Sequence, residues 1–207
     1  MPPLSSSQRC ALLALARHAI LEAVVQERIP ELGSLQDSLR GQDSLQGQDS
    51  LRGISAEPGA AFVTLYVRGH LRGCIGRSER DAPLAETIVQ SAIAAALQDP
   101  RFGPLGKGEA GNLEIEISVL SELLPISLQE IEIGKHGLLA RRGQLRGLLL
   151  PQVAVQRRWP PRRFLEETCR KAGLAPDAWR EPGTQLFAFT VEVFSEADFP
   201  AGYSSST

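Results

Sequence analysis

Two extended segments separated by a two-residue turn constrain this chain more than any other feature of its sequence. Ala60–Arg68 is rich in β-branched and aromatic residues, and Leu71–Ile75 continues in an extended pattern. The intervening Gly69-His70 has the length of a tight turn, and tight turns join antiparallel strands. The sequence therefore predicts a β-hairpin and antiparallel pairing in the sheet that contains it.

Other elements follow from the spacing of apolar residues. Apolar residues recur every three or four positions from Gln8 to Glu27, which predicts an amphipathic helix. Residues 113–120 alternate between apolar and polar, as a half-buried strand does. Asp81 as a cap and Pro83 in the first turn predict a helix over Leu84–Leu97. A third helix is expected at Pro161–Ala172, ending at Gly173, and further strands at Glu130–Ile133, Leu138–Arg142, Leu145–Leu150 and Gln185–Phe194.

These elements indicate an α+β fold in which helices flank a mainly antiparallel β-sheet. With 207 residues, of which 43% are apolar and 22% charged, the chain is long enough for one substantial core. We expect a single domain over residues 8–196, followed by a flexible tail at 197–207.

A hexapeptide repeat interrupts the pattern after the first helix. Its three units span residues 36–41, 42–47 and 48–53, and each contains one leucine and ends in glycine. Such units bury too little apolar surface to offset the entropy of ordering the chain. Residues 34–56 are therefore expected to be a mobile, low-complexity insertion.

Charge and cysteine content favour a cytoplasmic protein without cofactor or metal. The net charge of -2 gives no reason to expect an overall attraction to nucleic acid or to anionic membranes. The sequence shows no secretory signal and no apolar run near the roughly 20 residues that cross a bilayer. Its three cysteines, Cys10, Cys74 and Cys169, are widely spaced and lack metal-ligand spacing, which is typical of reduced thiols.

One segment departs from this balanced charge. Between Lys135 and Lys171 ten lysines and arginines face two glutamates, a local charge of +8. Adjacent arginines point to different faces of a strand or helix, and single-stranded nucleic acid also favours exposed aromatic side chains, of which the segment offers Trp159 and Phe164. We interpret the segment as solvated charge and do not expect a nucleic-acid partner, but keep an RNA-binding module as an alternative.

The second strand of the predicted hairpin carries the most interesting chemistry. Alternation along an extended strand places Arg72 and Cys74 on one face and Leu71 on the other. A neighbouring guanidinium lowers the pKa of a thiol and makes it a better nucleophile. Cys74 and Arg72 are therefore candidate catalytic residues, although a free cysteine in a strand is often packed in a core.

The neighbours of Cys74 extend this candidate site. Gly73 and Gly76 lack side chains, so a substrate could approach the backbone there. His136, His70 and Glu116 are candidate proton acceptors for the thiol, although both histidines are also typical of exposed turns.

Residues His70–Gly76 (HLRGCIG) resemble the signature of the AMMECR domain family. Residues 92–102 (AIAAALQDPRF) resemble the family's stretch ending in Asp-Pro-Arg-Phe, and residues 113–120 resemble its glutamate-bearing strand. Further matching motifs follow in the family's order at residues 133–137, 150–153 and 169–174, so that the resemblance covers about residues 8–196. The chain departs from the pattern at the hexapeptide repeat and at Arg77-Ser78, where many relatives have Thr-Phe.

The resemblance implies a two-lobed α+β fold with the Arg-Gly-Cys segment near a groove between the lobes. It also implies a setting with a Memo-like protein and a radical SAM enzyme, the AmmeMemoRadiSam system, in which this chain would be protein A. The family has no settled activity. We therefore expect a component that binds a partner enzyme, small molecule or peptide in a groove formed by His70, Gly73, Ile75, Gly76 and Glu116. The alternative is a cysteine-dependent enzyme with Cys74 as the nucleophile.

Overall fold

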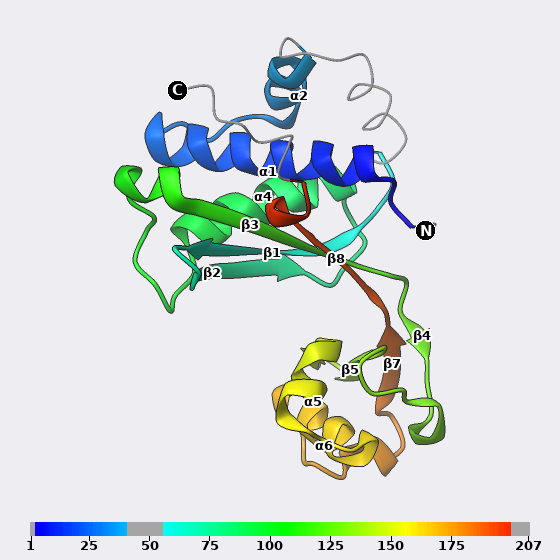
Figure 1. Cartoon of the computed structure of the whole chain (residues 1–207). Coiled ribbons are helices and arrows are strands. Elements are labelled where there is room, and N and C mark those ends of the chain that lie inside the picture. The colour runs from blue at the N-terminus through cyan, green and yellow to red at the C-terminus, as the bar shows by residue number, and fades with distance from the viewer. Residues whose placement is uncertain (1–2, 41–55, 200–207) are drawn as a thin grey trace. The chain divides into compact units, whose positions relative to one another are not determined.

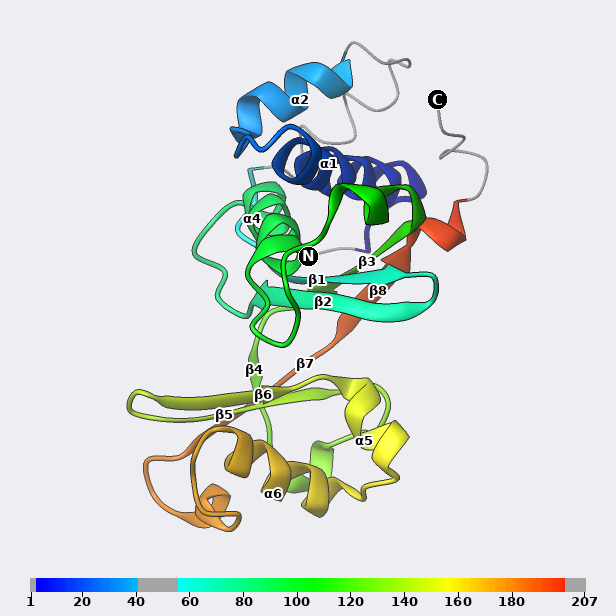
Figure 2. The same ribbon diagram turned by 90° about the vertical axis from the view of Figure 1, so that its left-hand side faces the viewer.

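The computed structural model describes residues 3–40 and 56–199. They form two compact units (Figures 1 and 2). Leu120–Glu192 makes up one, called here the inserted unit, and the described residues on either side of it make up the other, the main unit. Each unit has an antiparallel sheet flanked by helices and its own hydrophobic clusters. The expected α+β fold with two lobes is confirmed.

The main unit places two long helices on one face of a four-stranded sheet (Figures 1 and 2). Its described helices are α1 (Ser6–Val25), α2 (Leu32–Arg40) and α4 (Leu84–Leu97), with short 3-10 helices η1 (Lys107–Asn112) and η4 (Glu196–Asp198). Its strands are β1 (Ala60–Val67), β2 (His70–Arg77), β3 (Leu113–Leu120) and β8 (Val191–Ser195), paired in the order β2-β1-β3-β8. The largest core cluster lies between α1, α4 and this sheet.

The hairpin turn differs by one residue from the predicted one. Arg68 and Gly69 have positive φ angles of 51° and 75°, which is the backbone of the turns that join antiparallel strands most tightly. His70 is already the first residue of β2. The predicted Gly69-His70 turn is therefore wrong by one position.

The start of α4 also differs in detail. Its N-cap is Pro83, and no side chain caps the first turn. Asp81, the predicted cap, instead accepts two hydrogen bonds from Arg77 at 2.7 and 2.8 Å. Arg77, four residues before Asp81, binds the carboxylate that was expected to cap the helix.

Part of the predicted low-complexity insertion is helical. α2 covers residues 34–40 of it, and Leu35 is completely buried against Leu15 of α1 and Val89 of α4. The expectation that residues 34–56 form no ordered structure is wrong for this part, because one leucine is enough to anchor a short helix on an existing apolar surface. Residues 41–55 lie outside the described residues.

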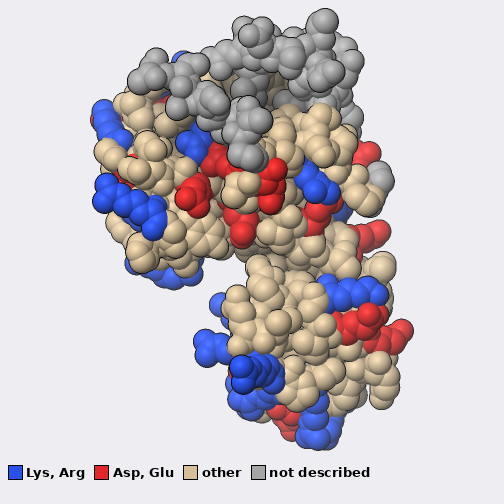
Figure 3. Space-filling model, viewed as in Figure 1, with Lys and Arg blue, Asp and Glu red and all other residues tan. Residues whose placement is uncertain are grey.

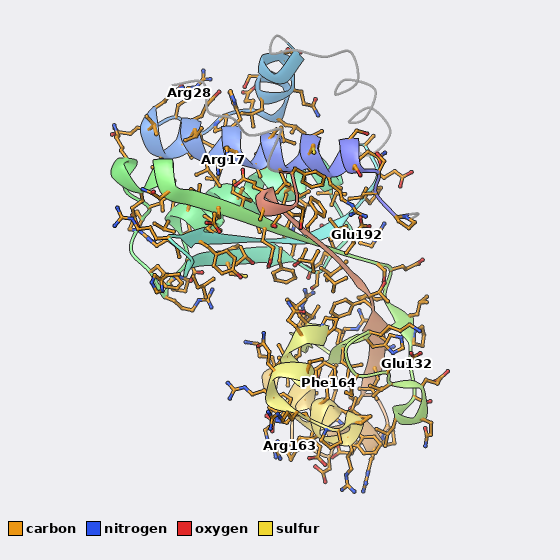
Figure 4. The ribbon with its side chains drawn as sticks, in the orientation of Figure 1. Arg17, Arg28, Glu132, Arg163, Phe164 and Glu192 are labelled. Atoms are coloured by element: carbon orange, nitrogen blue, oxygen red, sulfur yellow. The ribbon has the colours of Figure 1, made fainter. Side chains whose placement is uncertain are left out.

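The inserted unit packs two helices against a second four-stranded sheet. Its strands are β4 (Leu124–Pro125), β5 (Gly137–Arg142), β6 (Leu145–Leu149) and β7 (Gln185–Phe189), paired in the order β4-β7-β5-β6. Its helices are α5 (Pro151–Arg157) and α6 (Pro161–Lys171), with short 3-10 helices η2 (Leu128–Glu130) and η3 (Ala178–Arg180). Phe164 of α6 is fully buried between these helices and the sheet (Figure 4).

Two predicted strands of this region are corrected by the structure. Glu130–Ile133 is not a strand, because η2 ends at Glu130 and a turn follows, while Ile131 packs into the core from irregular backbone. The predicted strand Gln185–Phe194 is divided at Thr190, so that β7 and β8 belong to different sheets. The short helix α5 was not predicted.

An ion pair between Arg17 and Glu196 joins the end of the main unit to its first helix. The Arg17 guanidinium of α1 binds both carboxylate oxygens of Glu196 and donates to the Leu113 carbonyl at 2.6 Å. Glu196 also accepts the Ile115 amide at 3.0 Å. This Arg17–Glu196 clasp joins α1, where Figure 4 labels Arg17, to β3 and η4. Beyond the predicted domain end at residue 196, Phe199 packs on the core.

Within residues 3–40 and 56–199, no helix is long and apolar enough to cross a membrane.

Replacing Arg17 with methionine should destabilise the protein by roughly 2–4 kcal/mol, because Glu196 would remain buried without its cation. Urea unfolding followed by circular dichroism measures the change. Arg162→Met is the matched control: Arg162 is 63% exposed and pairs with Glu166 at the surface, so its loss should cost less than about 1 kcal/mol. Equal losses in the two variants would contradict the role of the clasp.

Candidate functional site

β2 is an edge strand, and its pairing with β1 contains one irregularity. Leu65 lies opposite Gly73, whereas the next residue, Tyr66, lies opposite Leu71. Arg72 is therefore an extra residue in a β-bulge. A bulge breaks the alternation of side chains along the strand.

The bulge changes which side chains share a face. Cys74 lies opposite Thr64, and Leu71 lies opposite Tyr66. Thr64 and Tyr66 are two residues apart in β1 and so lie on the same face of the sheet. Cys74 therefore shares its face with Leu71. The prediction that Arg72 and Cys74 lie together on one face is wrong, because it assumed unbroken alternation.

The Arg72 side chain is engaged in contacts away from Cys74. It binds Glu109 through two nitrogens at 2.8 and 3.0 Å. It also donates to the carbonyls of Gly103 at 2.8 Å and Pro104 at 2.9 Å. The guanidinium lowers the pKa of the Glu109 carboxyl, and Glu109 raises the pKa of Arg72. Arg72 thus ties the loop after α4 to the edge of the sheet.

Another ion pair holds Cys74 in place. The Asp99 carboxylate accepts the Cys74 backbone N–H at 2.8 Å and binds Arg101 at 2.7 and 3.0 Å. Arg101 in turn donates to the Cys74 carbonyl at 3.2 Å. The outward-facing donor and acceptor of an edge strand are thereby both satisfied, which also protects this edge from pairing with another chain.

The charges of Asp99 and Arg101 act on each other. Hydrogen bonds from the Arg101 side chain hold the pKa of the Asp99 carboxyl far below its usual range, although Asp99 is almost completely buried. The pKa of Arg101 is raised chiefly by Asp99, with a smaller contribution from the nearby Cys74 thiol. Arg101, and not Arg72, is therefore the cation beside Cys74.

The polar side chains around Cys74 come from three strands. The Thr64 hydroxyl donates to the Cys74 sulfur at 3.4 Å. Burial raises the pKa of Tyr66, and electrostatic interactions with Glu116 and Cys74 add to the effect. Burial, and secondarily Asp198, also raises the pKa of Glu116. We call Thr64, Tyr66, Leu71, Cys74 and Glu116 the Cys74 face.

The two glycines serve packing within the fold. A Cβ at Gly73 would overlap the Ala95 carbonyl of α4, and one at Gly76 would overlap Ala61 and Phe62 of β1. These positions thus have a structural role, and the approach of a substrate to the backbone there stays a prediction. Close packing of helix on strand and strand on strand requires them to lack side chains.

The remaining predicted residues are dispersed. Ile75 packs against the main core, and His70 is exposed at the start of β2. His136 belongs to the inserted unit, where its Nδ1 accepts the Glu132 amide at 3.2 Å. Its proposed role as a base for Cys74 stays a prediction.

Three contributing residues were not predicted from the sequence. Asp99 and Arg101 lie in the Asp-Pro-Arg-Phe motif, so the family resemblance marked their position without indicating their contacts. The contribution of Glu109 could not be predicted from the sequence, because an isolated glutamate after a glycine-rich loop has many possible roles. Among the described residues, no group of three or more histidine, cysteine or acidic side chains is arranged to hold a metal ion.

The variant Asp99→Asn should be about 1–3 kcal/mol less stable at neutral pH, because it keeps the shape but loses the charge that Arg101 binds. A carboxyl whose folded-state pKa is depressed stabilises the fold above its unfolded pKa, which is about 3.9. This contribution is lost as the pH falls toward the folded-state pKa. The difference between wild type and variant in urea unfolding should therefore shrink below about pH 4.

Asp81→Asn provides the control, since Asp81 is 58% exposed and pairs with Arg77 at the surface. It should change stability by less than about 1 kcal/mol. A loss for Asp99→Asn that stays constant down to strongly acidic pH would contradict the ion pair with Arg101.

Comparisons with known proteins agree with the motifs. The AMMECR1 family model matches residues 13–194. A protein from Methanothermobacter thermautotrophicus is 37% identical over 201 residues, which cover 94% of this chain and 97% of the relative. A protein from Aquifex aeolicus is 46% identical over 145 residues, covering 66% of this chain and 74% of the relative. The crystal structure of an uncharacterized protein from Pyrococcus horikoshii is 34% identical, covers 93% of both chains and aligns with a TM-score of 0.77. The chain belongs to the AMMECR1 family.

Proposed function

We propose that the protein is a non-catalytic component that binds a partner or substrate through the Cys74 face. The expected setting is the system with a Memo-like protein and a radical SAM enzyme. The observation that carries the proposal is that both arginines near Cys74 form ion pairs with carboxylates of this chain. Arg72 binds Glu109, and Arg101 binds Asp99. Both cations position the backbone around Cys74, which suits presentation of a surface better than turnover.

The rigidity of this segment supports a binding role. The Asp99–Arg101 pair holds the Cys74 backbone, and Arg72 holds the loop that contains Gly103 and Pro104. A surface that is ordered before binding loses less conformational entropy when a partner docks. The edge of β2 is thus already ordered before a partner binds.

The composition of the Cys74 face supports the same conclusion. Leu71 is 41% exposed, and the half-buried Tyr66 lies opposite it. An exposed aliphatic residue beside an aromatic ring, next to the polar Thr64 and Glu116, combines the apolar centre and polar surroundings found in protein interfaces. A protein partner or a peptide would suit this combination.

Replacing Leu71 with aspartate should weaken binding of the Memo-like protein or the radical SAM enzyme at least roughly tenfold, because it places a charge in the apolar centre. Isothermal titration calorimetry with each purified partner from the same organism measures the change. Val155→Asp is the matched control, since Val155 is 53% exposed and lies in the inserted unit. No binding of either partner by the wild-type protein, or equal weakening by both variants, would refute the proposal.

A second candidate is a cysteine-dependent enzyme. The observation that favours it is the position of Arg101, whose guanidinium interacts electrostatically with Cys74. The Thr64 hydroxyl donates to the same sulfur.

The rate of alkylation by iodoacetamide at neutral pH distinguishes the two candidates. A non-catalytic Cys74 should react no faster than free glutathione. An activated thiolate should react faster, and Arg101→Gln should remove the excess rate. Mass spectrometry of the tryptic peptides separates Cys74 from Cys10 and from the fully buried Cys169. A fast, Arg101-dependent reaction would favour the enzyme.

A further inference from the structure

The two long helices of the main unit pack on one face of its sheet, and the Cys74 face lies on the other. Ile115 and Ile117 of β3 and Phe194 of β8 belong to the core cluster between the helices and the sheet. Because side chains alternate along a strand, Glu116 and Val193 point to the face away from the helices. Val193 therefore extends the Cys74 face to β8, which is the edge strand on the side opposite β2.

Apolar side chains are exposed toward both edges of this face. Leu71 on β2 is 41% exposed, and Val193 on β8 is 47% exposed. The half-buried Tyr66 lies on β1, between these two edge strands. Three strand spacings separate β2 from β8, a width on the order of 14 Å. A face of this width with apolar side chains toward both edges suits a protein surface better than a small molecule.

A half-buried carboxylate lies between these apolar side chains. Glu116 is on β3, and burial is the main reason why the pKa of its carboxyl is raised, with a smaller contribution from Asp198. In the part of the chain that the structure describes, no lysine or arginine forms an ion pair with Glu116. Removing a charged group from water without giving it a cation costs free energy. Glu116 therefore destabilises the unbound protein at neutral pH.

The fully buried acidic side chains are different. Among residues 3–40 and 56–199 there are three of them, and each binds an arginine: Glu22 binds Arg28, Asp99 binds Arg101, and Glu196 binds Arg17. The fold thus supplies a cation wherever it buries a carboxylate completely. At Glu116 it removes water from the carboxylate and leaves the place of the cation to a ligand.

The surroundings of Glu116 favour a cation. Asp and Glu side chains gather over β3 and η4 on the main unit (Figure 3), so this surface repels anions such as phosphate. Tyr66 lies close enough to interact electrostatically with Glu116. An aromatic ring attracts an ammonium or guanidinium group placed over it, and its apolar surface packs against the stem of lysine or arginine. Carboxylate and ring together match both parts of such a side chain.

We propose that Glu116 binds a lysine or arginine side chain of the protein that docks on the Cys74 face. The carboxylate pairs with the ammonium or guanidinium group, and the Tyr66 ring packs against the apolar stem. Leu71 and Val193 contact apolar side chains on either side of this ion pair. The inference rests on the proposed binding function and adds to it the charge of the partner's contact residue. A carboxylate that destabilises the free protein then strengthens the complex.

Isothermal titration calorimetry of the full-length protein with the purified Memo-like protein and the purified radical SAM enzyme tests the proposal. Glu116→Gln should weaken binding of the partner roughly tenfold or more, because the partner's cation would lose its counter-ion at the interface. Glu116→Asp keeps the charge and should recover part of the affinity. Glu86→Gln is the matched control, since Glu86 is a half-buried glutamate on α4, which packs on the other face of the sheet. It should leave the affinity unchanged.

Thermal unfolding followed by circular dichroism separates binding from folding. A carboxyl whose folded-state pKa is raised opposes folding at neutral pH, where the unfolded chain ionises it freely. Glu116→Gln should therefore raise the midpoint of unfolding while it weakens binding. A fall of both the midpoint and the affinity would assign Glu116 a structural role and contradict the proposal.

Failure of this inference differs from failure of the proposed function. If the wild-type protein binds neither partner, both are refuted. If Leu71→Asp weakens binding but Glu116→Gln behaves like Glu86→Gln, the Cys74 face binds its partner without a cation at Glu116, and this inference alone is refuted. Spermidine is the probe for a small amine as the occupant. Spermidine binding that is as tight as that of the partner, and is weakened by Glu116→Gln, would also overturn the proposal.

Discussion

The close approach of α4 to β2 at Gly73 determines the geometry around Cys74. Because Gly73 has no side chain, the Ala95 carbonyl of the helix can lie against the strand. The chain that leaves α4 is then near enough for the Asp99 carboxylate to reach the Cys74 amide. Arg72 fastens the following loop from the other side of the bulge. Helix, loop and edge strand thus form one ordered surface, on which the proposed partner binding depends.

The sequence predicted the elements well where periodicity alone decides them. Leu84–Leu97 and residues 113–120 have the predicted bounds, because buried faces set the spacing of their apolar residues. The cation expected beside Cys74 was Arg72, whereas the structure places Arg101 there. A bulge leaves no mark in the periodicity of a short strand, and its presence moves Arg72 away from the face of Cys74. The acidic partner of Arg72, Glu109, is distant in sequence, so no local pattern could reveal it.

Local sequence patterns also failed to reveal the strand division and the side-chain pairing in the inserted unit. Gln185–Phe194 looks like one long strand, because the residues that leave one sheet and enter the other are equally apolar. The arginines of the basic segment could be counted from the sequence, but their pairing could not. Register places Arg141 opposite Arg146 and brings Phe187 beside them, whereas helical spacing gives Arg162 an acidic neighbour. A net local charge therefore says little about how the individual cations are used within the fold.

The division at Thr190 has a consequence for folding. β3 and β8 are neighbours in one sheet, yet residues 121–190 separate them in the sequence. Joining them before the inserted unit has folded would require closure of a long loop, whose entropic cost slows the pairing of distant strands. Folding of the inserted unit first, through its local β5–β6 hairpin and helices, would shorten this loop. The last strand of the main sheet would then be its slowest to form, and the Arg17–Glu196 clasp would close only after it.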